Sequence, residues 1–184
     1  MNKRTIPKQF GLFKSVLAEV IYGEQTVTLA NVHLQPFPGL DENPGITDVL
    51  KALGKTEPIR VREMELILGK LPAEGAVIIL GDFNSFSIMA APSLLRNEGY
   101  VDSFASAHKT PDDVEHITWR WPAPTKEKAD PPSGRIDYIW HSPALKTQSS
   151  RVLRAGPSDH FPVASELCLA APATRPATQP TTAP

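Results

Sequence analysis

The hydrophobic positions of the chain follow two different spacings, which predict alternating strands and helices. Apolar and polar residues alternate over Val16 to Tyr22 and again over Thr26 to Leu34, and the segment Gly23-Glu24-Gln25 separates the two runs. Two alternating runs joined by a glycine-containing turn are typical of a β-hairpin. The wholly apolar run Val77 to Leu80, which ends at Gly81, indicates a further strand covered on both faces.

Two other stretches have helical spacing. Pro58 opens the first, with Glu and Arg residues on its polar face. Its apolar residues recur every three or four positions: Val61, Met64, Leu68 and Leu71. The second runs from Pro92 to Glu98 and is stopped by Gly99. The segment Gln35 to Asp48 is rich in Pro, Gly, Asp and Asn, so we expect a surface loop there.

The second half of the chain adds two strands and ends in a biased tail. Strands are expected over Arg135 to Trp140 and Val163 to Leu169, and a polar, proline-containing loop over Pro111 to Lys128. Strands interleaved with helices predict one layered α/β (α+β) domain over residues 1–169. Residues 170–184 are almost all Ala, Pro, Thr and Gln, and we expect this tail to be disordered because it buries too little apolar surface.

Composition narrows the function classes. The chain of 184 residues has the size of a single domain, and its 19 basic and 20 acidic side chains give a formal net charge of -1. This charge argues against a strong global grip on a polyanion such as DNA, although a local basic groove stays open. Cys168 is the single cysteine, which excludes an internal disulfide and a cysteine-based zinc site.

Targeting signals are not visible in the sequence. No apolar run is long enough to cross a bilayer. Lys14 and Glu19 interrupt any apolar core of a signal peptide, and no small-residue cleavage site follows. We therefore expect a soluble chain without a signal peptide, in a compartment that the sequence leaves open.

Two groups of polar side chains fall at the ends of predicted strands. Asn31 and His33 share one face at the end of the second strand, where a structural histidine is the simple alternative. Asp82 and Asn84 share a face directly after the apolar strand. They could form only an Asx turn, or they could hold a hard cation and orient a water molecule.

Two further groups follow later in the chain. Asp137 lies inside an apolar run, where an unpaired carboxylate is costly, so its partner is either Arg135 on the same face or a histidine that it orients. Asp159 and His160 precede the last strand and could alone be a polar turn. Together, the four groups supply the His, Asp and Asn side chains that are typical of a phosphoryl-transfer site.

In this order, four stretches resemble the endonuclease/exonuclease/phosphatase superfamily of DNase I-like metal-dependent hydrolases. They are Asn31 to Leu34, Gly81 to Ser85, Arg135 to Ile139 and Ser158 to Val163, and the likeness spans about Val16 to Leu169. The resemblance implies a two-sheet β-sandwich flanked by helices, with the site at one end of the sheets. It also implies a divalent-metal-dependent phosphoesterase that uses Mg²⁺ or Mn²⁺.

The resemblance assigns a role to each of five catalytic residues. Asp82 would act as the general base for the attacking water or lie at the metal, and Asn84 would orient that water or the phosphate. His33 and His160 would stabilise charge on the phosphoryl oxygens or on the leaving group, and Asp137 would orient His160. The physical basis is that the transition state loads charge onto phosphoryl oxygens, which a cation and histidine donors can stabilise.

The implied metal ligands are Asp82, Asn84 and Asp159, and here the pattern is incomplete. The superfamily's usual pattern begins earlier, with an Asn and a metal-binding Glu that have no counterpart in this chain. Glu19 is the one tempting substitute, and we expect it to be structural and exposed. The cation would then be held weakly, and one sheet would present an open edge or a bare apolar face. A missing N-terminal segment, a mis-called start and a decayed paralogue all stay open as explanations.

The motifs do not select one phosphate-ester substrate. A nuclease, a sphingomyelinase-like lipase, an inositol-phosphate phosphatase and a nucleotide phosphodiesterase are all compatible, so nucleic acid, phospholipid and small phosphodiesters are candidate substrates. The alternative is a non-catalytic remnant that binds a phosphate-bearing ligand or a protein partner. We expect His108, His116 and His141 to be surface residues. For Trp119 and Trp121, packing over the sheet edge is favoured over lining a substrate rim.

Overall fold

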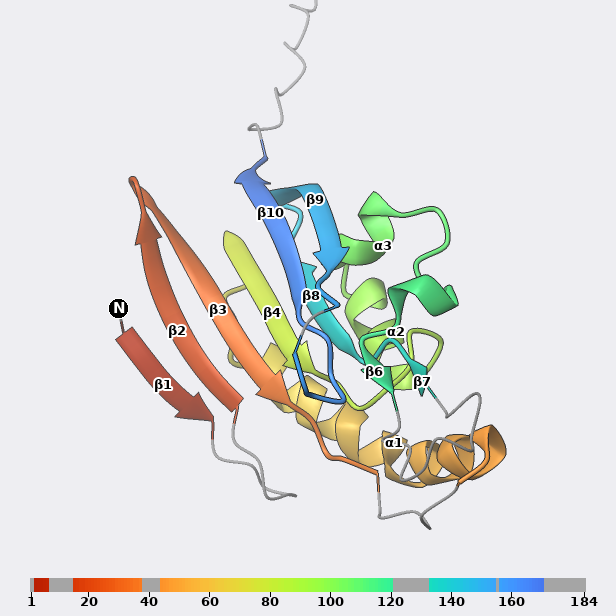
Figure 1. Ribbon diagram of the computed structural model, residues 1–184. Coiled ribbons are helices and arrows are strands. Elements are labelled where there is room, and N and C mark those ends of the chain that lie inside the picture. Colours follow the sequence, from red (N-terminus) through yellow and green to blue (C-terminus); the bar gives the residue numbers. More distant parts are fainter. Residues whose placement is uncertain (1, 7–14, 38–43, 121–132, 155, 171–184) are drawn as a thin grey trace, which may run out of the picture.

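A six-stranded sheet forms the centre of the computed structural model, which describes residues 2–6, 15–37, 44–120, 133–154 and 156–170 (Figure 1). The strands β3 and β4 run parallel, and the other paired neighbours run antiparallel. The order across the sheet is β1 (Asn2–Ile6), β2 (Ser15–Tyr22), β3 (Gln25–His33), β4 (Ala76–Asp82), β8 (Asp137–His141) and β5 (Val101–Asp102).

The predicted hairpin is present as β2 and β3. Tyr22 pairs with Gln25 across a two-residue turn, in which Gly23 has a φ of +60°. A positive φ at the first turn position matches the right-handed twist of paired strands, and glycine adopts it without strain. The apolar run at Val77 to Leu80 forms the middle of β4, as its composition predicts.

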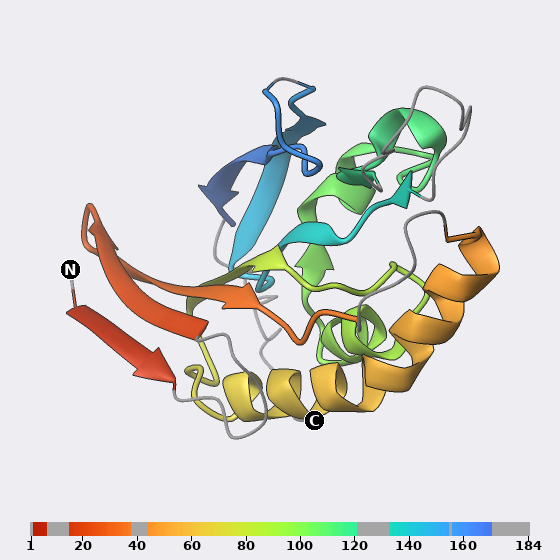
Figure 2. The same cartoon turned by 60° about the horizontal axis from the view of Figure 1, so that its bottom comes forward.

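The helix α1 (Ile46–Leu68) connects β3 to β4 and is longer than the sequence predicts. It begins at Ile46, inside the segment expected to be a loop, because the backbone N–H of Gly45 donates to the Asp48 carboxylate and caps the first turn. Pro58 therefore lies inside the helix rather than at its start. Proline removes one helical hydrogen bond and disfavours a straight helix, and α1 bends along its length (Figure 2).

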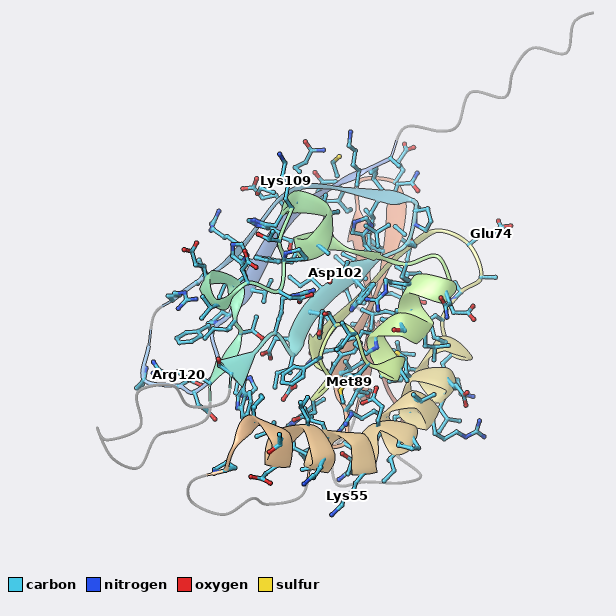
Figure 3. All side chains as sticks on the ribbon, turned by 90° about the vertical axis from the view of Figure 1, so that its right-hand side faces the viewer. Lys55, Glu74, Met89, Asp102, Lys109 and Arg120 are labelled. Carbon is cyan, nitrogen blue, oxygen red and sulfur yellow. The ribbon has the colours of Figure 1, made fainter. Side chains whose placement is uncertain are left out.

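The apolar face of α1 covers one face of the central sheet, together with α2 (Ala90–Asn97). Their buried side chains form the main core, whose members include Ala30, Val32, Met64, Ile67, Val77, Ile79, Leu95 and Trp140. The predicted helical positions Val61, Leu68 and Leu71 pack against its edge. The opposite face of α1 carries Lys55, which points away from the sheet (Figure 3).

A two-stranded sheet lies on the other face of the central sheet. It consists of β9 (Leu145–Val152) and β10 (Val163–Leu169), and Leu145 and Leu167 pack against Val27 and Ile78. The remaining elements are short: α3 (Ser103–Ala107), the 3₁₀ turn at Val114–His116, β6 (Trp119–Arg120) and β7 (Ser133–Gly134). The layered α/β expectation is confirmed, with a central sheet between helices and a smaller sheet.

Of the three histidines expected at the surface, His141 differs from the expectation. His141 is buried, not exposed, because Nδ1 bonds the Ser142 carbonyl and Nε2 bonds the Thr147 hydroxyl. His108 and His116 are half-buried and pack against the ring of Phe104.

The packing interpretation of Trp119 is confirmed, since it is buried with its ring edge-on to Phe37. Trp121 and the predicted tail from residue 171 onward lie outside the described residues. Glu19 is exposed, as expected. Within the described ranges, no helix combines the length and apolar character that a membrane crossing requires.

Candidate active site

Strand pairing brings three of the predicted site residues into one row. In the register of the central sheet, His33 on β3 pairs with Asp82 on β4, and Asp82 pairs with Asp137 on β8. Directly paired residues point to the same face, so the three side chains meet where these three adjacent strands end or begin. The Nε2 atom of His33 lies 3.5 Å from Oδ2 of Asp82.

The close approach of the ends of β3 and β4 depends on the residue before Asp82. Gly81 has a φ of +130°, and a Cβ built there would lie 1.9 Å from the carbonyl oxygen of Val32. Only glycine fits this position without displacing the backbone of β3. The strand end that carries Asp82 can therefore sit tightly against the strand end that carries His33.

His160 reaches the row from a separate segment and pairs with Asp137. Its Nδ1 atom lies 3.0 Å from Oδ2 and 3.3 Å from Oδ1 of Asp137. A carboxylate only accepts, so Nδ1 carries the proton and Nε2 is the nitrogen that can face a substrate. The hydrogen bond to Asp137 raises the pKa of His160, the charges of Asp82 and Asp159 add to it, and partial burial opposes it.

Arg135 does not pair with Asp137. Its guanidinium is buried and donates to Asp102 at 2.7 Å and to Asp112 at 3.1 Å, away from the row of site residues. Asp102 lies in the interior beside β8 (Figure 3). Of the two partners that the sequence left open for Asp137, the structure selects the histidine.

Asp82 and Asn84 form a tight turn after β4. The Asn84 backbone N–H donates to Oδ1 of Asp82 at 2.7 Å, and Nδ2 of Asn84 donates to Oδ2 at 3.1 Å and to the Leu34 carbonyl at 3.1 Å. Asn84 has a φ of +49°, which asparagine tolerates better than most residues. The Asx turn is thus present, and it also binds the Asn84 amide to the segment that follows His33.

The environment of Asp82 disfavours a negative charge. Burial, followed by the charge of Asp137, raises the pKa of Asp82 to about 7, while the Asn84 N–H, His160 and Arg60 oppose the rise. Two carboxylates paired across adjacent strands in a partly buried place repel each other. A proton or a cation between them would relieve this repulsion.

The donor set fits a divalent cation. One ligand atom each from Asp82, Asp137 and His160 lies within 4.8 Å of the others, and carboxylate oxygens are the ligands that hard cations prefer. Both oxygens of Asp137 lie near His160, and both oxygens of Asp82 accept hydrogen bonds from Asn84. Asp159 is exposed and lies outside this cluster, and its role as a ligand stays a prediction.

An apolar cavity adjoins the pair. Its volume is about 370 Å³, and Asp137 and His160 form part of its wall. The rest of the lining is mostly apolar and comes from β4, β8 and the approach to β10: Leu80, Ile139, Phe161, Pro162 and Val163. The polar cluster therefore borders a space large enough for a small organic group.

Thr118 holds both members of the Asp137–His160 pair, and sequence reasoning missed it. Its fully buried hydroxyl accepts the backbone N–H groups of Ile136 and Asp137, each at 3.0 Å, and its carbonyl accepts the N–H of Phe161 at 2.7 Å. The next residue, Trp119, bridges to His160. A threonine at the end of a polar loop carries no local signal for such distant partners.

Comparison with known proteins identifies the class. A profile of the Endonuclease/Exonuclease/phosphatase family matches residues 18–160, and the chain belongs to this family. Members of the family are hydrolases that include nucleases and phosphatases. A search of curated proteins found no significant match.

Solved structures share the fold at low sequence identity. A functionally unknown conserved protein from Enterococcus faecalis V583 is 22% identical with a TM-score of 0.59, and the match covers 90% of this chain and 60% of that protein. The human Nocturnin catalytic domain with bound sulfate is 17% identical with a TM-score of 0.58, covering 92% and 59%. D. rerio TDP2, complexed with a single-strand DNA product, is 15% identical with a TM-score of 0.60, covering 91% and 67%.

These matches establish a DNase I-like fold for the chain. The family resemblance stated from the four motifs is confirmed. The chain spans 60% of the length of the E. faecalis protein and 59% of the Nocturnin domain.

Proposed function

We propose that the chain is a divalent-metal-dependent phosphoesterase. The observation that carries this proposal is the convergence of Asp82, Asp137 and His160 at the ends of adjacent strands, with His160 hydrogen-bonded to Asp137. The chain belongs to a family of hydrolases, and this cluster contains the residue types that phosphate-ester hydrolysis requires.

The roles follow from the chemistry of a phosphate ester. Charge develops on the phosphoryl oxygens and on the leaving group, and preorganised donors stabilise it. The Nε2 atom of His160 serves as such a donor because its Nδ1 is held by Asp137. His33 lies on the other side of Asp82 and is the second donor. The proposed site thus has a histidine on each side of its central carboxylate.

The remaining side chains deal with the nucleophile. Asp82, whose pKa is raised to about 7, is suited to accept a proton from a water molecule near neutral pH. Asn84 is fixed by its bonds to Asp82 and Leu34 and orients that water or the phosphate. In the alternative in which Asp82 lies at the metal, Asp82, Asn84 and Asp159 would hold Mg²⁺ or Mn²⁺, and the ion would polarise a phosphoryl oxygen.

The proposed substrate is a phosphate ester: a nucleic acid, a phospholipid or a small phosphodiester. Two structural neighbours support this class, since TDP2 was solved with a single-strand DNA product and Nocturnin with sulfate, an anion with the tetrahedral shape of phosphate. The net charge of -1 favours a small or locally bound ester over extended duplex DNA.

A substrate panel tests the proposal. The purified chain and a version extended upstream are assayed with Mg²⁺ and with Mn²⁺ on bis(4-nitrophenyl) phosphate, single-stranded DNA and a phospholipid. Hydrolysis of at least one ester, abolished by EDTA, is the expected result. No hydrolysis by either version, with normal binding of a protein partner, would reject the enzyme in favour of a non-catalytic binding module.

A further inference from the structure

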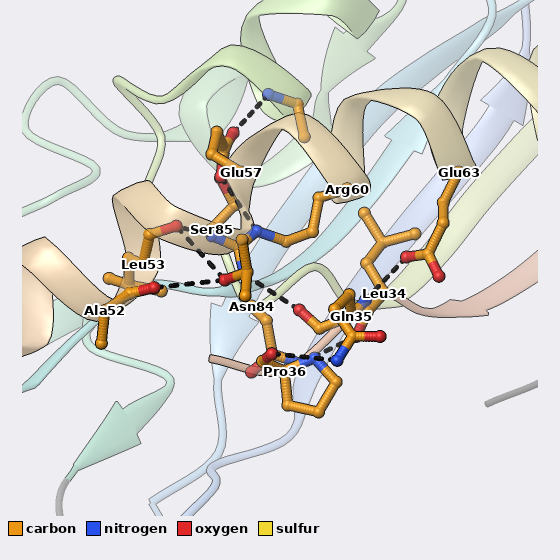
Figure 4. Close-up of polar contacts among 12 residues, drawn as sticks. Leu34, Gln35, Pro36, Ala52, Leu53, Glu57, Arg60, Glu63, Asn84 and Ser85 are labelled. Carbon is orange, nitrogen blue, oxygen red and sulfur yellow. Dashed lines mark hydrogen bonds and ion pairs between the residues drawn. The ribbon is translucent and has the colours of Figure 1, made fainter. Parts of the chain in front are cut away.

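One face of α1 buries three charged side chains close together. The exposed fractions of Glu57, Arg60 and Glu63 are 8%, 0% and 4%. Figure 4 shows these residues between α1 and the segments that follow β3 and β4. Burying charges costs free energy unless each is paired and hydrogen-bonded, so this cluster demands a complete set of partners.

Arg60 has that set. Its guanidinium donates to Oε2 of Glu57 at 2.9 Å and to the Thr56 hydroxyl at 2.6 Å. It also donates to the carbonyl of Leu53, in the turn of α1 where Pro58 interrupts the helical hydrogen bonding. Its last partner lies outside the helix and is the carbonyl of Gln35, at 2.9 Å.

The cluster fixes the chain just beyond His33. Both backbone groups of Gln35 bond to α1: the carbonyl accepts from Arg60, and the N–H donates to Oε2 of Glu63 at 2.7 Å. The preceding residue, Leu34, uses its carbonyl to accept from the Asn84 side chain. The exit of β3 is thereby tied to α1 on one side and to Asn84 on the other.

The cluster also fixes the turn that carries Asn84. The hydroxyl of Ser85, the next residue, donates to the Glu57 carboxylate, with 2.9 Å to each oxygen. Glu57 further accepts the N–H of Ala91 at 2.7 Å, in the first turn of α2, whose own N-cap residue Met89 makes no side-chain cap. The Glu57 carboxylate of α1 therefore caps α2 and also holds the turn after β4 that carries Asn84.

We propose that the Glu57–Arg60–Glu63 cluster positions the active site. It holds Gln35, and through the short link of Leu34 it sets the place of His33. It holds Ser85, and so keeps Asn84 in its left-handed conformation against Asp82. Because small displacements of reacting groups cost large factors in rate, this cluster acts on turnover without touching the substrate. The kinetic part of this proposal rests on the proposed function, and its structural part does not.

Arg60→Lys is the primary test variant. Lysine keeps the positive charge but lacks the planar fork that serves several acceptors at once. We expect the folded variant to lose roughly tenfold to a hundredfold in kcat with KM changed less than about twofold. In the metal-free protein, NMR resonances of the His33 ring and the Asn84 side-chain amide should shift or broaden.

Arg62→Ala is the matched control. Arg62 lies on the same helix, is exposed and pairs only with Glu65 among the contacts described, at 2.9 Å. The Arg62→Ala variant should have the kcat of the parent chain, and its His33 and Asn84 resonances should match those of the parent chain. Wild-type kcat and wild-type resonances in folded Arg60→Lys, with only a lower Tm, would overturn the proposal and leave the cluster a purely structural element.

Ser85→Ala decides the question if Arg60→Lys does not fold. It removes one link, while Glu57 keeps Arg60 and Ala91 as partners. We expect a folded chain with faster hydrogen exchange at the Asn84 amide and a lower kcat. Parent-like exchange and kcat would overturn the proposal. If no variant and no parent chain hydrolyses any ester, the proposed function fails, and the NMR and exchange measurements still decide on positioning.

Discussion

The carboxylate of Asp137 accepts a hydrogen bond from Nδ1 of His160 at 3.0 Å, although 23 residues separate the two in the sequence. The bond fixes which ring nitrogen carries the proton and raises the pKa of the imidazole. Thr118 supports this bond, because its hydroxyl accepts the N–H of Asp137 and its carbonyl accepts the N–H of Phe161, the residue after His160. The pair is thus preorganised before any substrate arrives.

Asp137→Asn should disable this pair and change its pH dependence. The raised pKa of His160 contributes stability that is present below the ordinary histidine pKa and is lost as pH rises through the raised value. The variant should therefore lose more Tm at about pH 5.5 than at about pH 8.5, with kcat lower by roughly a hundredfold. NMR titration of His160 checks the cause, since a pKa unchanged by the substitution would contradict it.

Asp82→Asn should also change the pH dependence of stability in the metal-free chain, through the carboxyl group of Asp82. Burial and Asp137 raise the pKa of Asp82 to about 7, so the folded state favours the protonated carboxyl. The stability from this protonation is lost as pH rises from about 4 toward 7. The amide does not titrate, so the Tm of the variant relative to the parent, in EDTA, should rise between about pH 5 and about pH 8. A difference that stays flat would show that Asp82 has an ordinary pKa.

Thr118 offers a comparison of two near-isosteric changes. Thr118→Val keeps the shape but leaves the N–H groups of Ile136 and Asp137 without their acceptor, which should cost roughly 1–3 kcal/mol of unfolding free energy for each buried group. Thr118→Ser keeps the hydroxyl and should retain most of the stability and kcat. Chemical unfolding and steady-state kinetics check both. Equal unfolding free energies and equal kcat values in the two variants would show that the Thr118 hydroxyl does not support the Asp137–His160 pair.

Elements with a strong local pattern were predictable from the sequence. The β2–β3 hairpin, β4, α2 and β10 follow from alternation, from a continuous apolar run and from Gly or Pro at their ends. The first half of α1 was not predictable, because Gly54 and Pro58 weaken the local helical signal and tertiary packing of Val49 and Leu53 overrides it. The polar strand β9 gave no alternation to detect.

The same division holds for the site. His33, Asp82, Asp137 and His160 fall at strand ends, where a pattern of polar residues is visible along the chain, and the structure brings them together. Arg60 and Thr118 were missed because their partners lie far away in the sequence. In the chain, Arg60 looks like one more charge on the polar face of a helix, and only the fold shows that it is buried.

The most direct measurement is the rate of Mg²⁺-dependent phosphodiester hydrolysis in variants of the strand-end cluster. Asp82→Ala and His160→Ala are compared with Glu166→Gln, an exposed carboxylate on β10 that bonds only the Ser149 hydroxyl among the contacts described. The account predicts a loss of roughly a hundredfold to a thousandfold in both cluster variants and a parent-like rate in the control. Hydrolysis that survives in folded Asp82→Ala and His160→Ala would contradict it.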